Sequence, residues 1–180
     1  MFKEWAAVRR LLLVYLDAGG AAGIQALQPA LHRLRAALPD THISLWAREE
    51  DELEAHRLAG VNTLLCTGDN WAAGMEDLAA RLGTRSFDAA LILTEPGASP
   101  FTPAYACYLA GIPVRLGQSV EFGGSVLSHR ISPAFPPLPA AQHHLHLLHA
   151  VGLARPPAPR PGTPAQLAKE QKHEPRCKWS

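Results

Sequence analysis

The residues best suited to chemistry lie in a glycine-rich stretch, DAGGAAG, that begins at Asp17 directly after an apolar run. Ala18, Gly20 and Gly23 give the spacing A-x-G-x-x-G. Glycines so spaced between a strand and a helix let the backbone approach a pyrophosphate, while a later acidic residue, here Glu49, binds the ribose. The alternative is a tight strand-to-helix turn. We favour the turn and expect no cofactor, and we keep NAD, NADP or nucleotide binding as the competing hypothesis.

Two other sets of reactive side chains occur in the second half of the chain. Four histidines form a cluster: His143, His144, His146 and His149. His146 and His149 are three positions apart and could share a helical face and bind a metal, but no acidic residue lies within the cluster, so a solvated helix face is the better interpretation. The serines lack the G-x-S-x-G pattern of a serine nucleophile. We expect neither a metal site nor a serine hydrolase.

The elements that position these residues follow from the apolar pattern. Five short aliphatic runs predict strands, at residues 11–16, 42–46, 61–66, 87–93 and 114–116. Helical patterns fill the gaps, at residues 24–38, 50–58, 71–82 and 103–109, with Asn70 and Thr102 as expected N-caps. Such alternation predicts a doubly wound α/β domain, Rossmann-like, with a parallel sheet covered by helices on both faces. Its chemistry belongs in the loops beyond the carboxyl ends of the strands.

The C-terminal part changes in character. A proline-rich connector, AFPPLPA, precedes a last helix with an apolar stripe of Leu145, Leu148 and Val151. We therefore expect one domain over residues 1–153. Residues 154–180, rich in proline and charge, are expected to be a loosely ordered linker or truncated tail.

Composition excludes several classes of partner. The 180 residues carry a formal net charge of only +1, so we expect no nucleic-acid partner. Three cysteines lie far apart and form no C-x-x-C pair, which fits a reducing cytoplasm. The apolar run after Arg10 stops at Asp17, and no stretch approaches the roughly 18 apolar residues of a membrane span. We expect a cytoplasmic protein with at most peripheral contact with a membrane.

A longer segment, LLLVYLDAGGAAGIQALQPALHRLRAALPDTHISLW, resembles the opening of the heptosyltransferases, which form glycosyltransferase family 9. The matching positions are Leu16, Asp17, Gly20, Pro29, Ala30, Leu31, Leu34 and Arg35. The later stretches FDAALIL, YACYLAGIPVRLGQSVEFGGSVLSHRI and LHLLHAVGL are similar to the rest of the same N-terminal domain. The resemblance covers residues 9–153. It implies the acceptor-binding half of a two-domain GT-B transferase that acts in lipopolysaccharide core synthesis at the inner membrane.

The resemblance also implies site residues. The family's base is the aspartate of a G-D pair, but here Ala21 follows Gly20, and Asp17 is the only carboxylate left in the loop. Asp17 is therefore the candidate base, although we favour a role in ordering the loop and capping the helix that follows. Val120 stands where relatives often have lysine, and a histidine expected before the last helix is replaced near Pro139. The candidate substrate-binding residues are Gly20, Arg48, Glu95, Arg115, Gln118 and Glu121, with Arg130 as a further cation.

The expected partners follow from this resemblance. A sugar acceptor, such as a lipopolysaccharide core or another glycan, would bind this domain. A nucleotide-sugar donor such as ADP-heptose would need a second Rossmann-like half, which a proline-rich tail cannot build. We therefore expect a chain that is inactive alone, as a truncated product or one half of a split enzyme. A non-catalytic remnant that binds a glycan or a partner is the remaining alternative.

Overall fold

The computed structural model describes residues 5, 7–121 and 124–153, and they fold around one parallel sheet of six strands. The strand order is β3-β2-β1-β4-β5-β6, and every neighbouring pair is parallel. The strands are β1 (Arg10–Val14), β2 (His42–Arg48), β3 (Thr63–Thr67), β4 (Ala89–Ile92), β5 (Val114–Gln118) and β6 (His129–Ile131). The predicted Rossmann-like α/β class is confirmed.

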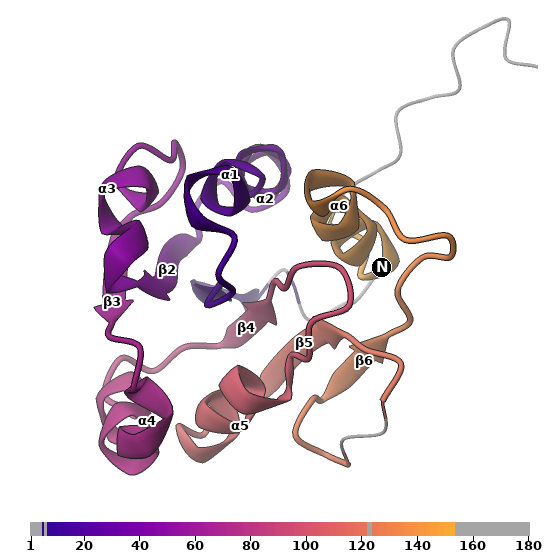
Figure 1. Ribbon diagram of the computed structural model, residues 1–180. Coiled ribbons are helices and arrows are strands. Elements are labelled where there is room, and N and C mark those ends of the chain that lie inside the picture. Colours follow the sequence, from indigo (N-terminus) through magenta and orange to yellow (C-terminus); the bar gives the residue numbers. More distant parts are fainter. Residues whose placement is uncertain (1–4, 6, 122–123, 154–180) are drawn as a thin grey trace, which may run out of the picture.

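Helices cover both faces of the sheet (Figure 1). On one side lie α1 (Gly20–Gln25), α2 (Gln28–Ala37), α3 (Glu52–Ala55) and α6 (Ala140–Ala150). On the other lie α4 (Met75–Gly83) and α5 (Phe101–Leu109), which pack against each other. Short 3-10 turns, η2 (Glu49–Asp51) and η3 (Trp71–Gly74), precede α3 and α4. Sequence order alternates strand and helix up to β5, as right-handed crossovers require.

β1 from Leu11 onward and the whole of β4 are apolar and buried, because both faces of these central strands are covered. In β1 and the residue that follows it, Leu11, Leu13 and Tyr15 enter the core under α1, α2 and α6. Leu12 and Val14 enter the other core, with α4 and α5. This alternation brings Tyr15 to the carboxyl end of β1 on the α1 side, where it becomes part of the site described below.

Several local predictions were wrong. The pattern over residues 24–38 forms two helices, because the chain bends between Gln25 and Gln28. Thr102 is not an N-cap: α5 begins after Pro100 and has no side-chain cap. In α6 the residue buried beside Leu148 is Leu147, whereas Leu145 is only half-buried.

The sixth strand was not predicted, since β6 has only three residues, HRI, and none is fully buried. The expected tail at 154–180 lies outside the described residues.

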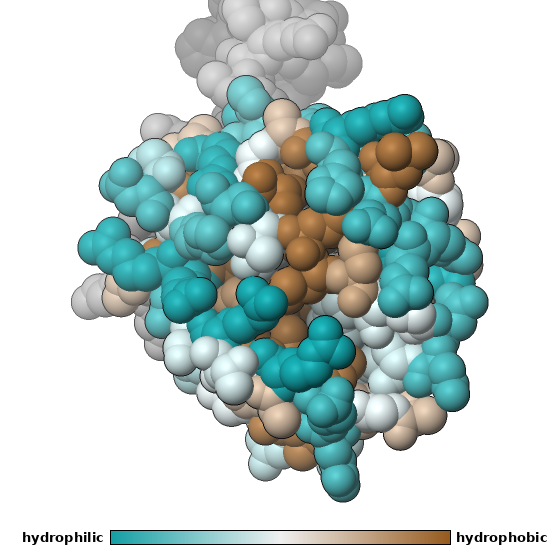
Figure 2. All heavy atoms as spheres, turned by 90° about the vertical axis from the view of Figure 1, so that its left-hand side faces the viewer, coloured by the Kyte–Doolittle hydropathy of each residue, from teal (hydrophilic) through white to brown (hydrophobic). Residues whose placement is uncertain are grey.

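The edge strand β3 borders an apolar surface. Its five residues are half-buried, and Figure 2 shows a stripe of hydrophobic side chains on this face of the molecule between hydrophilic flanks. A cavity of about 370 Å³ opens here, with Trp46, Leu65 and Leu78 in its wall. The described residues in its lining include Cys66, Arg81 and Arg85 but no carboxylate or histidine. Within the described part of the chain, every helix is too short or too polar to cross a bilayer.

Candidate functional site

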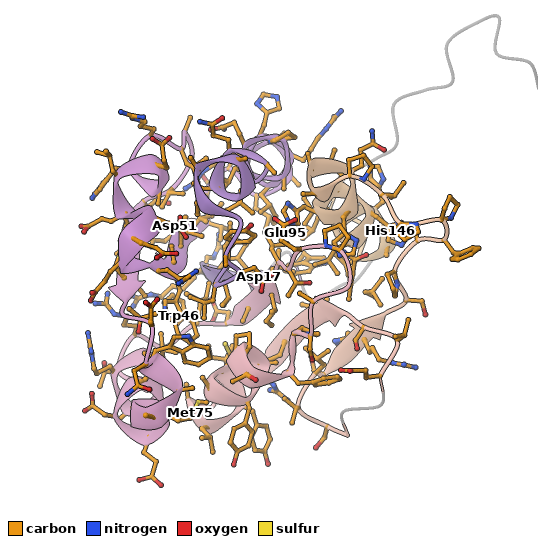
Figure 3. The ribbon with its side chains drawn as sticks, viewed as in Figure 1. Asp17, Trp46, Asp51, Met75, Glu95 and His146 are labelled. Carbon is orange, nitrogen blue, oxygen red and sulfur yellow. The ribbon has the colours of Figure 1, made fainter. Side chains whose placement is uncertain are left out.

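Two side chains join the loops that follow β1 and β4. The carboxylate oxygen Oδ2 of Asp17 accepts the backbone N–H of Glu95 at 2.5 Å. The hydroxyl of Tyr15 donates to Oε1 of Glu95, also at 2.5 Å. Because β1 and β4 are adjacent parallel strands, residues just beyond their carboxyl ends are neighbours in space. Figure 3 shows Asp17 and Glu95 close together near the centre of the view.

The glycines of the first loop leave room for this cluster. A Cβ atom on Gly23 would lie 2.0 Å from the Tyr15 hydroxyl, and one on Gly19 would lie 2.3 Å from it. Both positions would also be within 3.2 Å of Glu95 Oε1. Gly20 has a φ of +55°, a left-handed conformation that favours glycine. Close packing at Gly23 and a sharp turn at Gly20 thus account for the spacing of these glycines.

A buried histidine closes the cluster from α6. His144 lies edge-on to Tyr15, with ring centroids 6.0 Å apart. Its Nε2 is 3.3 Å from the carbonyl of Thr94, and its Nδ1 is 3.4 Å from that of Ala26. Burial lowers the pKa of His144, although Glu95 and Asp17 oppose the shift. The interpretation of the histidines as a solvated helix face is therefore wrong for His144 and His143, which are both buried.

The other two histidines lie away from this cluster. His146 bonds the carbonyl of Ser132 at 3.1 Å and is labelled on α6 in Figure 3, and His149 lies one turn further along α6. Among the residues that the structure describes, no three metal-binding side chains come together.

The candidate arginines are engaged by other groups. Arg48, at the end of β2, pairs with Glu50 at 2.6 Å and with Asp69 at 2.7 Å. Arg130 donates at 3.3 Å to the carbonyls of Val120 and Glu121.

Arg115 has only 9% of its surface exposed. Its guanidinium donates to four backbone carbonyls, those of Ile112, Pro113, Ser125 and Val126. These residues precede β5 and β6. The guanidinium therefore lies toward the amino ends of these strands, and it also stacks 5.2 Å from the ring centre of Tyr108. The structure thus places it apart from the loops in which substrate would bind.

Two cavities adjoin the strand ends and share Ser99. The first, of about 250 Å³, is lined by Asp17, Thr94, Ser99 and Thr102 among others. The second, of about 280 Å³, lies between the loops after β4 and β5 and the connector before α6. Its lining contains Gln118, Ser119, Glu121 and His143. We call this second space the glutamine pocket.

The glutamine pocket has a fixed polar wall. Gln118 donates from Nε2 to the carbonyl of His143 at 2.9 Å. Its Oε1 and the Nε2 of His143 are buried and have no hydrogen-bond partner among the described residues. Glu121 accepts from the hydroxyl of Ser99 at 3.0 Å, and its N–H donates to the hydroxyl of Ser119 at 2.9 Å. Buried polar atoms without partners are rare in folded proteins, so this wall of the pocket keeps two polar atoms that the described residues do not satisfy.

The electrostatics favour proton transfer at Asp17. Burial raises the pKa of its carboxyl, with a further increase from Glu95, while the bond from the Glu95 N–H works in the opposite direction. A base is more effective when its pKa lies closer to the working pH. Burial, together with the bond to Glu95, raises the pKa of Tyr15 even further, so Tyr15 stays protonated and acts as a donor.

The sequence-predicted residues are thus divided between several places. Asp17 and Glu95 come together, Gln118 and Glu121 line the glutamine pocket, and Gly20 shapes the turn beside Asp17. Sequence reasoning missed Tyr15, His143 and His144. Tyr15 could have been found because it is a polar aromatic residue at the end of an otherwise aliphatic strand. The histidines could have been found because they lie in a helix with a buried apolar stripe.

A pH titration should reveal His144. Folding lowers the pKa of His144, so at falling pH the unfolded chain takes up the proton before the folded chain does. The contribution of His144 to the free energy of unfolding is therefore complete above about pH 6.5 and is lost at lower pH. The free energy of unfolding should fall as the pH drops below about 6.5, by up to about 1.4 kcal/mol per pH unit for each proton displaced. His144→Gln should flatten this slope in denaturant titrations, whereas His56→Gln, on an exposed site, should keep it. An unchanged slope in His144→Gln would contradict the assignment.

Solved structures with a similar fold include glycosyltransferases of family 9 and heptosyltransferases. A family 9 glycosyl transferase from Veillonella parvula superposes with a TM-score of 0.67 at 16% identity, over 81% of this chain and 42% of that one. The E. coli heptosyltransferase WaaC with ADP gives 0.65 at 15% identity, over 83% and 49%. E. coli ADP-heptose lipopolysaccharide heptosyltransferase II gives 0.60 at 19%, over 75% and 39%.

These comparisons concern the fold. The chain spans less than half the length of each of these three structures. No protein-family model matches the sequence, and no curated protein matches it. At such identities the likeness supports a glycosyltransferase-like fold, and any activity has to be argued from the site.

Proposed function

We propose that this chain is the acceptor-binding domain of a nucleotide-sugar-dependent glycosyltransferase. The observation that carries the proposal is the arrangement at the strand ends: Asp17, which is held by Glu95, lines a cavity that shares Ser99 with the glutamine pocket. An inverting transfer needs a carboxylate to take the proton of an acceptor hydroxyl, next to a site that holds the rest of the acceptor. The fold shared with family 9 transferases supports the same function.

Each candidate residue has a role in this proposal. Asp17 is the base: Oδ2 is held by the Glu95 N–H, and Oδ1 has no bond to the described residues. Gln118, Glu121 and Glu95 bind acceptor hydroxyls, and Gly20 shapes the loop that presents Asp17. Arg48 and Arg115 act indirectly, by fixing the loops after β2 and before β5.

The donor belongs to a second half. The site described here has no free cation for a diphosphate, and transferases of this kind place positive groups near the leaving diphosphate. We therefore propose that the described domain is inactive alone, that the activated sugar binds another segment or another chain, and that the acceptor is a glycan of the lipopolysaccharide core type. In that case it works in the cytoplasm, in peripheral contact with the inner membrane.

The experiment is a chemical-shift titration of the full 180-residue chain. The probes are deacylated lipopolysaccharide core oligosaccharide, ADP-heptose and NAD. We expect the oligosaccharide to shift the amides of Glu95, Gln118 and Ser119, and ADP-heptose to shift none of them. Incubation of the chain alone with both substrates should give no transfer. If NAD or ADP-heptose shifted residues 19–23 and the oligosaccharide shifted nothing, the nucleotide-binding alternative would replace this proposal.

An exposed aromatic should contribute to glycan binding. Phe135 lines the glutamine pocket with 96% of its surface exposed, and a flat ring can pack on the apolar face of a sugar. Phe135→Ala should weaken oligosaccharide binding about three- to tenfold and change the free energy of unfolding by less than about 0.5 kcal/mol. Leu53→Ala, which removes a side chain 68% exposed on α3, is the matched control and should leave binding unchanged. Equal affinities in both variants would exclude this role.

A further inference from the structure

We infer that the glutamine pocket selects an uncharged, hydroxyl-bearing sugar ring and rejects a phosphorylated one. This inference rests on the proposed function and specifies the chemical class of the acceptor. Three independent features of the pocket support it: its charge, its unpartnered polar atoms and its apolar rim.

The charge of the site disfavours phosphate. Among the described residues, the only charged side chain that lines the pocket is the carboxylate of Glu121, and the adjoining cavity adds that of Asp17. The nearby cations are engaged: Arg130 donates to the carbonyls of Val120 and Glu121, and Arg115 is buried among four carbonyls. A phosphate monoester carries about −1.5 to −2 charges at pH 7. It would meet a carboxylate and no free guanidinium.

The unpartnered atoms suit a hydroxyl. Gln118 and His143 are 4% and 3% exposed, and both line the pocket. The orientation of the Gln118 amide is fixed by the bond from Nε2 to the His143 carbonyl. The remaining atom, Oε1, can only accept a hydrogen bond. His143 is neutral near pH 7, since burial lowers its pKa, and its Nε2 can then donate or accept. A hydroxyl both donates and accepts, whereas an ionised phosphate cannot donate to Gln118 Oε1.

The rim is apolar. Val120 and Phe135 are 79% and 96% exposed and line the pocket with Pro133 and Pro137. A sugar ring presents C–H groups on one face and hydroxyls at its edge, so it can cover this rim while its hydroxyls face the polar wall that Gln118 and His143 form. The pocket volume of about 280 Å³ is at the low end for small-molecule sites, which suits one ring better than several.

The test compares one oligosaccharide with and without its phosphates. The probes are deacylated lipopolysaccharide core oligosaccharide and the same material after chemical dephosphorylation, each titrated into the full chain at low and high salt. We expect the dephosphorylated form to bind at least about threefold more tightly at low salt. Glu121→Lys, at an exposed position, should reverse the order by strengthening binding of the phosphorylated form about five- to tenfold. High salt should remove that gain.

A control variant separates local from global charge. Glu76→Lys makes the same change in net charge on the exposed surface of α4 and should leave both affinities unchanged. Equal affinity for the two probes, tighter binding of the phosphorylated form by the wild type, or an equal gain in both lysine variants would each overturn this inference and leave the proposed function standing. If neither oligosaccharide shifted the pocket amides, the proposed function would fail as well.

Discussion

Arg115→Met should lower the free energy of unfolding by about 3–5 kcal/mol. The guanidinium is the shared donor for the carbonyls of Ile112, Pro113, Ser125 and Val126, and it stacks on Tyr108. Methionine fills a similar volume but leaves these carbonyls without that donor, and each buried unsatisfied group costs about 1–3 kcal/mol. Since small domains are stable by only about 5–15 kcal/mol, chemical denaturation should show the loss directly.

Two further variants make this result specific. Arg115→Lys keeps the charge, but a compact ammonium cannot reach four carbonyls on two segments, so we expect it to recover less than half of the loss. Arg130→Met removes an exposed guanidinium with two long bonds and should cost less than about 1 kcal/mol. If Arg115→Met kept the stability of the wild type and lost oligosaccharide binding, the sequence-based assignment of Arg115 to the substrate would be restored.

Arg115 illustrates what sequence reasoning could reach. The pattern of aliphatic runs and amphipathic helices predicted the parallel α/β class, because burial on both faces leaves a strong signal in β1 and β4. It missed β6, whose three residues carry no such signal. The sequence also suggested that Arg115 binds substrate, because it lies in a strand next to a candidate loop. The sequence does not show whether the guanidinium points to the carboxyl end of the strand or, as here, to its amino end.

The candidate site was predictable in part for the same reason. Asp17 and Glu95 both follow apolar runs, and adjacent parallel strands bring such positions together. Gln118 and Glu121 were identified by their place after the last predicted strand. The contribution of His143 and His144 was not predictable. It depends on how α6, which is distant in sequence from β1, packs against the sheet and buries these two polar rings.

Gly23→Ala should destabilise the domain by about 3 kcal/mol, because overpacking in a rigid core costs about 1–3 kcal/mol or more. The new Cβ would lie 2.0 Å from the Tyr15 hydroxyl and 3.2 Å from Glu95 Oε1. Tyr15 is fully buried, and its hydroxyl is held by Glu95 at 2.5 Å, so the ring cannot give way without breaking that bond. Gly74→Ala, where a Cβ meets nothing within 4 Å, should change the free energy of unfolding by less than about 0.5 kcal/mol.

Combining Gly23→Ala with Tyr15→Phe tests the physical cause. Phenylalanine lacks the oxygen that the Cβ would strike, although the ring carbon that carried it remains 3.0 Å away. The double variant should therefore be more stable than the sum of the two single losses predicts, by at least about 1 kcal/mol in a double-mutant cycle. Strict additivity would mean that the loss in Gly23→Ala does not come from contact with the Tyr15 hydroxyl. The glycine spacing would then again be open to the nucleotide-binding interpretation, because the packing explanation would have lost its support.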